Sequence, residues 1–131
     1  MPEIRVTELN MDDKEAVIEI AIPNCTESKV NDDNCFIKTF CHPFCYPLSD
    51  YAISLFGFGV DNIWIEHTIS PPIKTPHGFF SYRLSAKVID TAKQHVKLGE
   101  YDFFLDTPLP KDICNGAIVS FDVLRIDISL E

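Results

Sequence analysis

The chain has 131 residues, of which 46% are hydrophobic and 24% charged, and its formal net charge at pH 7 is −9. This length is sufficient for one hydrophobic core and the composition is that of a globular protein, so we expect a single domain over 1–131. The acidic balance excludes the basic footprint that nucleic-acid binding requires, and no apolar run reaches the roughly 20 residues of a membrane-spanning helix.

Alternating apolar and polar residues run through most of the chain, a pattern that predicts strands with one buried face. Strands are expected at 4–9, 16–22, 35–41, 62–68, 80–88, 101–105 and 117–130. Two longer connections separate the later strands. The stretch 70–78 has three prolines and a glycine in nine residues, which indicates a loop, and 90–100 is expected to be a long hairpin connection.

The stretch 49–57 (SDYAISLFG) fits two patterns. Ser49 is a suitable N-cap and Gly57 a suitable stop, and the apolar residues between them fit one face of a helix. The same residues also form a strand pattern, with Tyr51, Ile53 and Leu55 on one side. The capping residues favour a short helix.

The last strand, 117–130, changes the parity of its apolar positions. Apolar side chains occupy odd-numbered positions up to Val123 and even-numbered positions from Ile126. Successive residues of a strand face opposite sides, so this change predicts a β-bulge or bend at Leu124–Arg125. Bent strands serve two faces in small barrels and orthogonal sandwiches. The sequence therefore predicts an all-β fold, a small barrel or a two-sheet sandwich of about seven strands.

The densest group of possible metal ligands is Cys25, Cys35, Cys41, His42 and Cys45. Structural zinc requires four tetrahedral ligands, which the sequence usually supplies as two closely spaced pairs. Here only the run from Cys41 to Cys45 is closely spaced, and the aromatic residues around it favour burial of these cysteines as small hydrophobic side chains. Cys41, His42 and Cys45 are the candidate metal ligands, with zinc as the metal, and no other cofactor is predicted.

Carboxylates also recur on the strands, Asp102 and Asp106 on one and Asp122 and Asp127 on another. Acid–base catalysis would require two of them to face one another across a pocket. Strand carboxylates more often form a solvated outer face, and this interpretation is favoured. The chain has no phosphate-binding glycine loop, EF-hand or nucleophile motif. We predict no catalytic or cofactor-binding residue, and a non-enzymatic role is favoured.

Two features bear on the compartment. The N-terminal sequence MPEIRVTELN has no basic region followed by an apolar run, as a signal peptide would have. Five cysteines are an odd number, which fits a reducing compartment better than a complete disulfide framework. The sequence therefore predicts a cytoplasmic protein with neither a membrane nor a nucleic acid as partner.

The favoured function is that of a small acidic binding protein that recognises or neutralises a macromolecular partner, as immunity proteins and inhibitors do. An acidic surface is steered electrostatically towards a protein with a basic surface. One alternative is a ligand-binding β-barrel or small enzyme, with an aromatic-lined pocket and the loop 70–78 at its mouth. Another is an accessory subunit that associates with itself through a strand edge or an aromatic patch.

Overall fold

The computed structural model describes residues 4–10, 12, 15–23, 34–41, 53–78 and 80–130, which are almost entirely β-structure. Its strands are β1 (Ile4–Asn10), β2 (Glu15–Pro23), β3 (Asn34–Cys41), β4 (Ile53–Phe58), β5 (Asp61–Glu66), β6 (Ile73–Lys74), β7 (Tyr82–Asp90), β8 (His95–Leu98), β9 (Tyr101–Leu105), β10 (Ile118–Val123) and β11 (Arg125–Leu130). One 3-10 turn, η1 (Thr91–Lys93), precedes β8. The predicted all-β class is confirmed. Within these ranges, no helix has the length and apolarity to cross a membrane.

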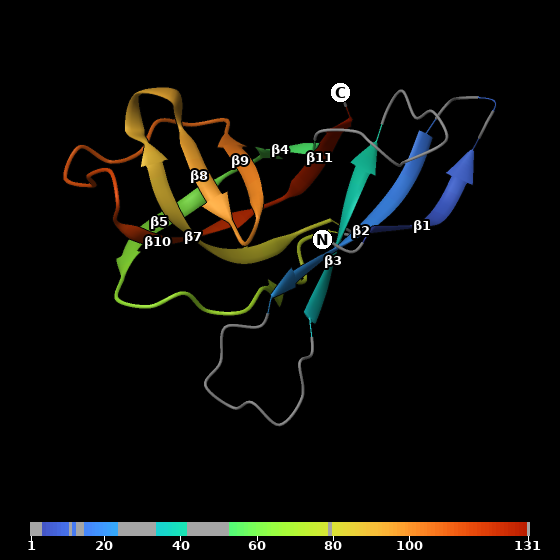
Figure 1. Ribbon diagram of the computed structural model, residues 1–131, viewed down its shortest axis with the longest axis horizontal. Coiled ribbons are helices and arrows are strands. Elements are labelled where there is room, and N and C mark those ends of the chain that lie inside the picture. Colours follow the sequence, from blue (N-terminus) through green and yellow to red (C-terminus); the bar gives the residue numbers. More distant parts are fainter. Residues whose placement is uncertain are drawn as a thin grey trace.

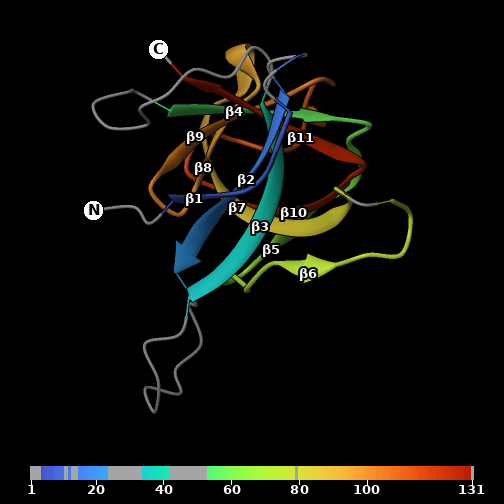
Figure 2. The same ribbon diagram turned by 90° about the vertical axis from the view of Figure 1, so that its right-hand side faces the viewer.

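All eleven strands belong to one open sheet, with the order β1-β2-β3-β11-β4-β9-β8-β7-β10-β5 and with β6 paired to β7. In Figure 1, β1–β3 form the right-hand part of the molecule and β5 and β7–β10 the left-hand part, with β11 running between them. Figure 2 shows β2 and β3 crossing in front of the other strands. The fold is thus one sheet with more strands than predicted, and it is more open than a small barrel.

Two segments, 53–66 and 118–130, run side by side as one long antiparallel ribbon. β11 pairs with β4 from Leu130 opposite Ile53 to Arg125 opposite Phe58. The pairing continues into β10 and β5, where Asp122 lies opposite Asp61 in the same register, and the register shifts by one residue between Asp122 and Ser120. Both strands of the ribbon bend at the same level, at Gly59–Val60 and at Leu124. The predicted bend at Leu124–Arg125 is confirmed, because β10 ends at Val123 and β11 begins at Arg125.

The bend makes the sheet curl around a packed interior. β11 lies beside β4 and β10 lies beside β7, so the path from β4 through β9, β8 and β7 returns to the same chain segment. Inside this curl, Phe103 and Phe121 are fully buried, and their ring centroids lie 5.6 Å apart. Each such burial contributes about 1.5–3 kcal/mol to stability. The interior is therefore filled by side chains, and the residues that alternate with them face outwards.

The helix favoured for 49–57 is wrong for the part of that stretch that the structure describes. Residues 53–58 form β4, while 49–52 lie outside the described residues. β4 is a central strand that hydrogen-bonds to β11 on one side and to β9 on the other. These two ladders outweigh the local capping signals, because tertiary context overrides weak helical propensity.

Two predicted connections also contain strands. Within 90–100 the segment HVKL forms β8, whose Val96 and Leu98 are buried. Two apolar residues are too few to show an alternation, so the pattern was missed. Within 70–78, Ile73 and Lys74 form β6 and pair with β7. The remaining predicted strands are present, with ends shifted by up to two residues.

The side chain of Tyr82 joins β3 to the curled part of the sheet. β3 pairs fully with β2, but it pairs with β11 at the single position where Phe40 lies opposite Asp127. The backbone N–H of Lys38 instead donates to the Tyr82 hydroxyl at 2.9 Å. Tyr82 is 5% exposed, so this hydroxyl satisfies a backbone donor where two strands diverge. Tyr101 contrasts with it, because its buried hydroxyl has no hydrogen-bond partner among the described residues.

These two buried tyrosines predict opposite responses to loss of the hydroxyl. Tyr82→Phe leaves the Lys38 N–H without its acceptor and should lower the free energy of unfolding by about 1–3 kcal/mol. Tyr101→Phe removes a buried polar group that has no partner, so it should leave stability unchanged or raise it. Urea unfolding of the two variants checks this, and equal losses in both would contradict the assignment.

Gly57 predicts a steric effect at the centre of the curl. A Cβ on Gly57 would lie 2.7 Å from Cε1 of Phe103 and 3.2 Å from Cγ2 of Val123. Because Phe103 is fully buried and cannot move aside, Gly57→Ala should cost about 1–3 kcal/mol. Gly78→Ala is the matched control, since a Cβ there meets nothing within 4 Å. If thermal denaturation shows similar small shifts for both variants, the packing described here is wrong.

Candidate functional site

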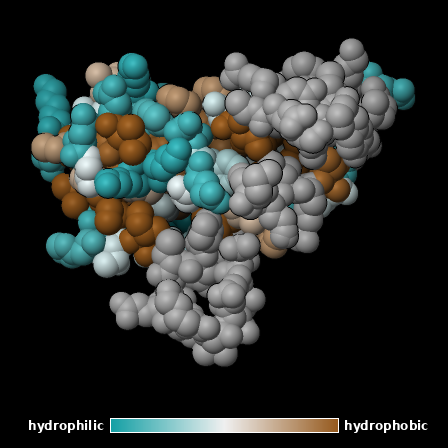
Figure 3. Space-filling model, viewed as in Figure 1, coloured by the Kyte–Doolittle hydropathy of each residue, from teal (hydrophilic) through white to brown (hydrophobic). Residues whose placement is uncertain are grey.

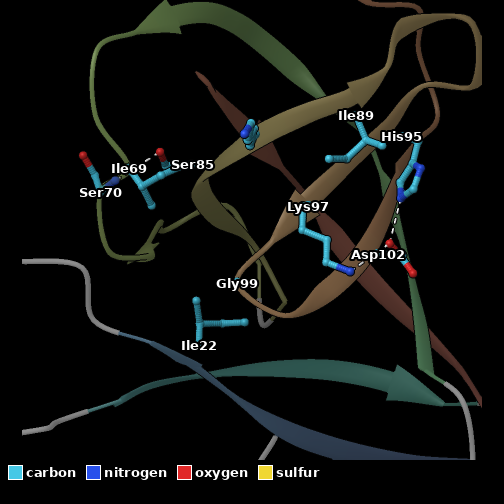
Figure 4. Close-up of a pocket in the computed structure, with 10 residues that line it drawn as sticks. Ile22, Ile69, Ser70, Ser85, Ile89, His95, Lys97, Gly99 and Asp102 are labelled. Carbon is cyan, nitrogen blue, oxygen red and sulfur yellow. Dashed lines mark hydrogen bonds and ion pairs between the residues drawn. The ribbon is translucent and has the colours of Figure 1, made fainter. Parts of the chain in front are cut away.

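A pocket of about 520 Å³ lies on the outer side of the curled sheet, and we call it the outer pocket. Its size is within the range of small-molecule sites. The lining residues are Ile22, Ile69, Ser70, Ser85, Lys87, Ile89, His95, Lys97, Gly99 and Asp102. Figure 4 shows Lys97 and His95 both directed at Asp102, with Ser70 and Ser85 on the far side and Ile22 reaching in from β2.

Strand alternation explains why these residues meet. On β7, Leu84, Ala86 and Val88 are buried inside the curl, so the odd-numbered positions between and after them face outwards. β8 and β9 alternate in the same way, which places His95, Lys97 and Asp102 on the same outer face. β2 supplies one wall and the segment after β5 supplies another. The pocket is therefore assembled from five separate parts of the chain.

Asp102 accepts hydrogen bonds from two side chains of β8. Its Oδ1 lies 2.8 Å from His95 Nε2 and 3.2 Å from Lys97 Nζ. A carboxylate only accepts hydrogen bonds, so Nε2 of His95 carries the proton. The hydrogen bond from His95 is the main cause that lowers the pKa of the Asp102 carboxyl below its ordinary value of 3.8, and Lys97 adds to it while partial burial opposes it. Asp102 is thus held as the anion.

A His–Asp pair can orient an imidazole as a base, but nucleophilic catalysis also requires a nucleophile within hydrogen-bond reach of that imidazole. Among the described residues, Asp102 is the one side chain that hydrogen-bonds to the His95 ring. The ring also stacks on Phe104, with 4.7 Å between centroids and 19° between planes. His95 therefore links Asp102 to the Phe104 ring on the outer face of β8 and β9.

A second outer feature continues from His95 across five strands. The cross-strand register sets Phe40 opposite Asp127, Asp127 opposite Phe56, Phe56 opposite Phe104, and Phe104 opposite His95. The Phe56 and Phe104 rings stack at 5.5 Å. Phe58 lies two residues beyond Phe56 on the same face of β4. We call Phe40, Phe56, Phe58 and Phe104 the outer aromatic surface.

Arg125 lies between the strands that carry these rings. Its guanidinium is 4.9 Å from the centroid of Phe58 and 6.0 Å from that of Phe40. Asp127 fixes it through two hydrogen bonds, of 2.8 Å and 3.1 Å. Phe56 and Phe58 nevertheless remain 37% and 40% exposed. Rigid, partly exposed rings beside an arginine are typical of protein interfaces.

Other exposed apolar side chains are more scattered. Elsewhere in the described residues, four large hydrophobic side chains have substantial exposure: Ile65, Ile73, Ile89 and Leu124. On the face shown in Figure 3, hydrophobic residues reach the surface between hydrophilic ones. Single exposed residues of this kind are normal for a folded protein, and of the four only Ile89 lines the outer pocket.

The three candidate metal ligands are only partly within the described chain. Cys41, the last residue of β3, is 1% exposed, as expected for a buried cysteine. His42 and Cys45 lie outside the described residues, so the zinc prediction is untested. Within the described ranges, no group of three or more His, Cys, Asp or Glu side chains is arranged to hold a metal ion.

The four strand carboxylates do not pair with one another. Asp102 binds His95 and Lys97, and Asp127 binds Arg125. The remaining two make equally specific contacts. Asp122 accepts from Arg83 and from the Asn62 amide, and Asp106 accepts from the backbone N–H groups of Gly59 and Val60. Each carboxylate thus serves a local structural contact on the outer side of the sheet.

The sequence did not single out Lys87, Lys97 or Phe56, although all three lie on these two outer features. The pairing of neighbouring strands places these three residues on the two outer features, and the paired strands are far apart in the sequence. A usable local signal did exist for Asp102, because the YDFFL segment places it on the polar side of a strand.

No protein-family model matches the chain, and neither curated proteins nor solved structures show a similarity to it.

The Asp102–His95 contact predicts a pH effect. A carboxyl with a lowered folded-state pKa stabilises the protein fully above its ordinary value of 3.8, and that contribution disappears as pH falls through the lowered pKa. His95→Phe keeps the stack on Phe104 but removes the donor. The Asp102 pKa, measured by NMR titration of the carboxyl carbon, should rise towards 3.8 in this variant.

The accompanying loss of stability at neutral pH should be about 0.2–1 kcal/mol, because the pair is partly exposed, and it should vanish at acid pH. His95→Gln is the control, since the amide can still donate to the carboxylate while carrying no charge. It should raise the Asp102 pKa less than His95→Phe does. An Asp102 pKa that is the same in all three proteins would show that the hydrogen bond does not form.

Proposed function

We propose that the chain is a non-enzymatic binding protein whose outer aromatic surface engages a protein partner with a basic surface. The outer aromatic surface suits a protein that recognises or neutralises such a partner, as immunity proteins and inhibitors do. The observation that carries the proposal is the exposure of Phe56 and Phe58 on a stacked, arginine-braced face.

The geometry of the rings supports this proposal. Phe56, Phe104 and His95 form a stack across three neighbouring strands, and Phe56 is more than a third exposed within it. Rings held in a stack lose little conformational freedom when a partner covers them, so little of the binding energy is spent on ordering. Aromatic and arginine side chains are also the types that contribute most at interfaces.

The charge of the chain supports a basic partner. The net charge of the chain is −9, whereas Asp102 and Asp127 beside the rings are already paired with Lys97 and Arg125. The field of this net charge increases the rate at which a basic protein meets the surface, and salt weakens it. The apolar rings would then provide the contact area, and the net negative charge of the chain would attract the partner.

Replacing both exposed rings should remove the association. We expect Phe56→Ser/Phe58→Ser to weaken binding of the partner at least about tenfold, because buried aromatic anchors each contribute about 2 kcal/mol or more. The partner is recovered by affinity purification of the tagged chain from its own host. Native mass spectrometry then identifies the partner from the mass of a stoichiometric complex. Binding of the purified pair is then measured by calorimetry.

Ile65→Ser/Ile73→Ser is the matched control, because these two side chains are 50% and 55% exposed and belong to β5 and β6. It should bind like the unsubstituted chain, and association should slow as salt rises from about 0.05 M to 0.5 M. Equal effects of the two double variants would contradict the proposal. A complex containing only copies of this chain would instead support self-association.

A further inference from the structure

The outer pocket supports a second inference, which does not rest on the proposed protein partner. We propose that this pocket binds a small organic anion whose charged end lies between Lys87 and Lys97 and whose apolar part packs against the pocket's isoleucines. A carboxylate with a short hydrocarbon body has the required chemistry.

Two lysines lie side by side on the wall that β7 and β8 form. The register of β7 and β8 places Lys87 directly opposite Lys97, and both line the cavity. Residues opposite each other in a sheet have Cβ atoms about 4.5–5.5 Å apart, and like charges at such positions are destabilising. The chain has 20 Asp and Glu residues against 11 Lys and Arg residues, so it has abundant carboxylates that could neutralise two adjacent lysines. A bound anion would remove the repulsion.

Asp102 neutralises only one of these lysines. It contacts Lys97 at 3.2 Å and also accepts from His95. Among the described residues, the ammonium group of Lys87 has no hydrogen-bond or ion-pair partner. The lining therefore has two ammonium groups and one carboxylate, an excess of positive charge on a chain of net charge −9. This local reversal of sign favours an anion over a cation.

A hydroxyl group in the pocket wall also lacks an acceptor. Ser85 is 4% exposed, and its Oγ accepts a hydrogen bond from the backbone N–H of Ser70 at 3.1 Å. Within the described chain, the Ser85 O–H donates to no protein group. Buried hydroxyl groups normally use their proton. A ligand oxygen in the pocket would supply the acceptor.

The rest of the lining requires an apolar ligand body. Ile22, Ile69 and Ile89 come from β2, from the segment after β5 and from β7, and they enclose the pocket from three directions. Ile89 is 42% exposed, so its burial by a ligand would be favourable. Inorganic phosphate would satisfy the lysines but would leave the partly exposed Ile69 and Ile89 in contact with water. The pocket therefore favours a carboxylate with a hydrocarbon chain.

Three probe molecules separate the contribution of the ligand's charge from the contribution of its apolar chain. Octanoate has a charge and an apolar chain, octanol has the same chain without the charge, and inorganic phosphate has the charge without the chain. By titration calorimetry on the full chain, octanoate should bind saturably with one site and at least about tenfold more tightly than either other probe, because charge-assisted hydrogen bonds and apolar burial both contribute. Amide NMR shifts should be centred on residues 85–89 and 95–99.

Variants of exposed residues keep the fold and test each role. Lys87→Gln should weaken octanoate binding about tenfold while leaving octanol unchanged. Lys93→Gln is the matched control, because Lys93 is exposed, lies in η1 and does not line the pocket. It removes the same charge and should change nothing. Ile89→Ser should weaken octanoate and octanol alike.

The proposal is wrong if octanoate does not bind, if octanol or phosphate binds as tightly, or if Lys93→Gln acts as strongly as Lys87→Gln. Its failure is distinguishable from failure of the protein-binding proposal. Phe56→Ser/Phe58→Ser changes no residue of the pocket, so this double variant should bind octanoate normally. Loss of octanoate binding in it would show that the two outer features are not independent.

Discussion

Leu124 donates its backbone N–H to the carbonyl of Phe58 at 3.0 Å, at the point where both strands of the long ribbon bend. This bond keeps 53–66 and 118–130 paired across the bend instead of letting them separate there. The change of parity at Leu124 then turns odd-numbered side chains inwards before the bend and even-numbered ones inwards after it. One continuous ribbon thereby supplies the interior of the curl with side chains from both halves.

The curl also decides what lies outside. Once Phe103 and Phe121 fill the interior, the residues between the buried positions of β4, β8 and β9 must face away from it. Those outer positions hold the stacked rings on one side and the lysine-lined pocket on the other, and His95 belongs to both. The packing of the interior thus places the two candidate binding features side by side, although no local motif specifies either one.

The sequence predicted those features that depend on local alternation. The buried faces of β2 and β7 and the bend at Leu124 follow from the period of two in the sequence. The sequence failed where neighbours distant in the chain decide: β4 is a strand because two ladders hold it, and β8 has too few apolar residues to show a pattern. The outer pocket could not be predicted for the same reason, because Lys87 meets Lys97 only through the register of β7 and β8.

Both outer features depend on the continuity of the ribbon through the bend, and hydrogen exchange at the Leu124 amide tests that continuity most directly. If the ribbon is continuous, this amide is protected from exchange to the same degree as the amides of β10 and β11 on either side, because opening it requires separation of both strands. Free exchange of the Leu124 amide, with its neighbours in both strands protected, would show that the ribbon is broken there and would contradict the account.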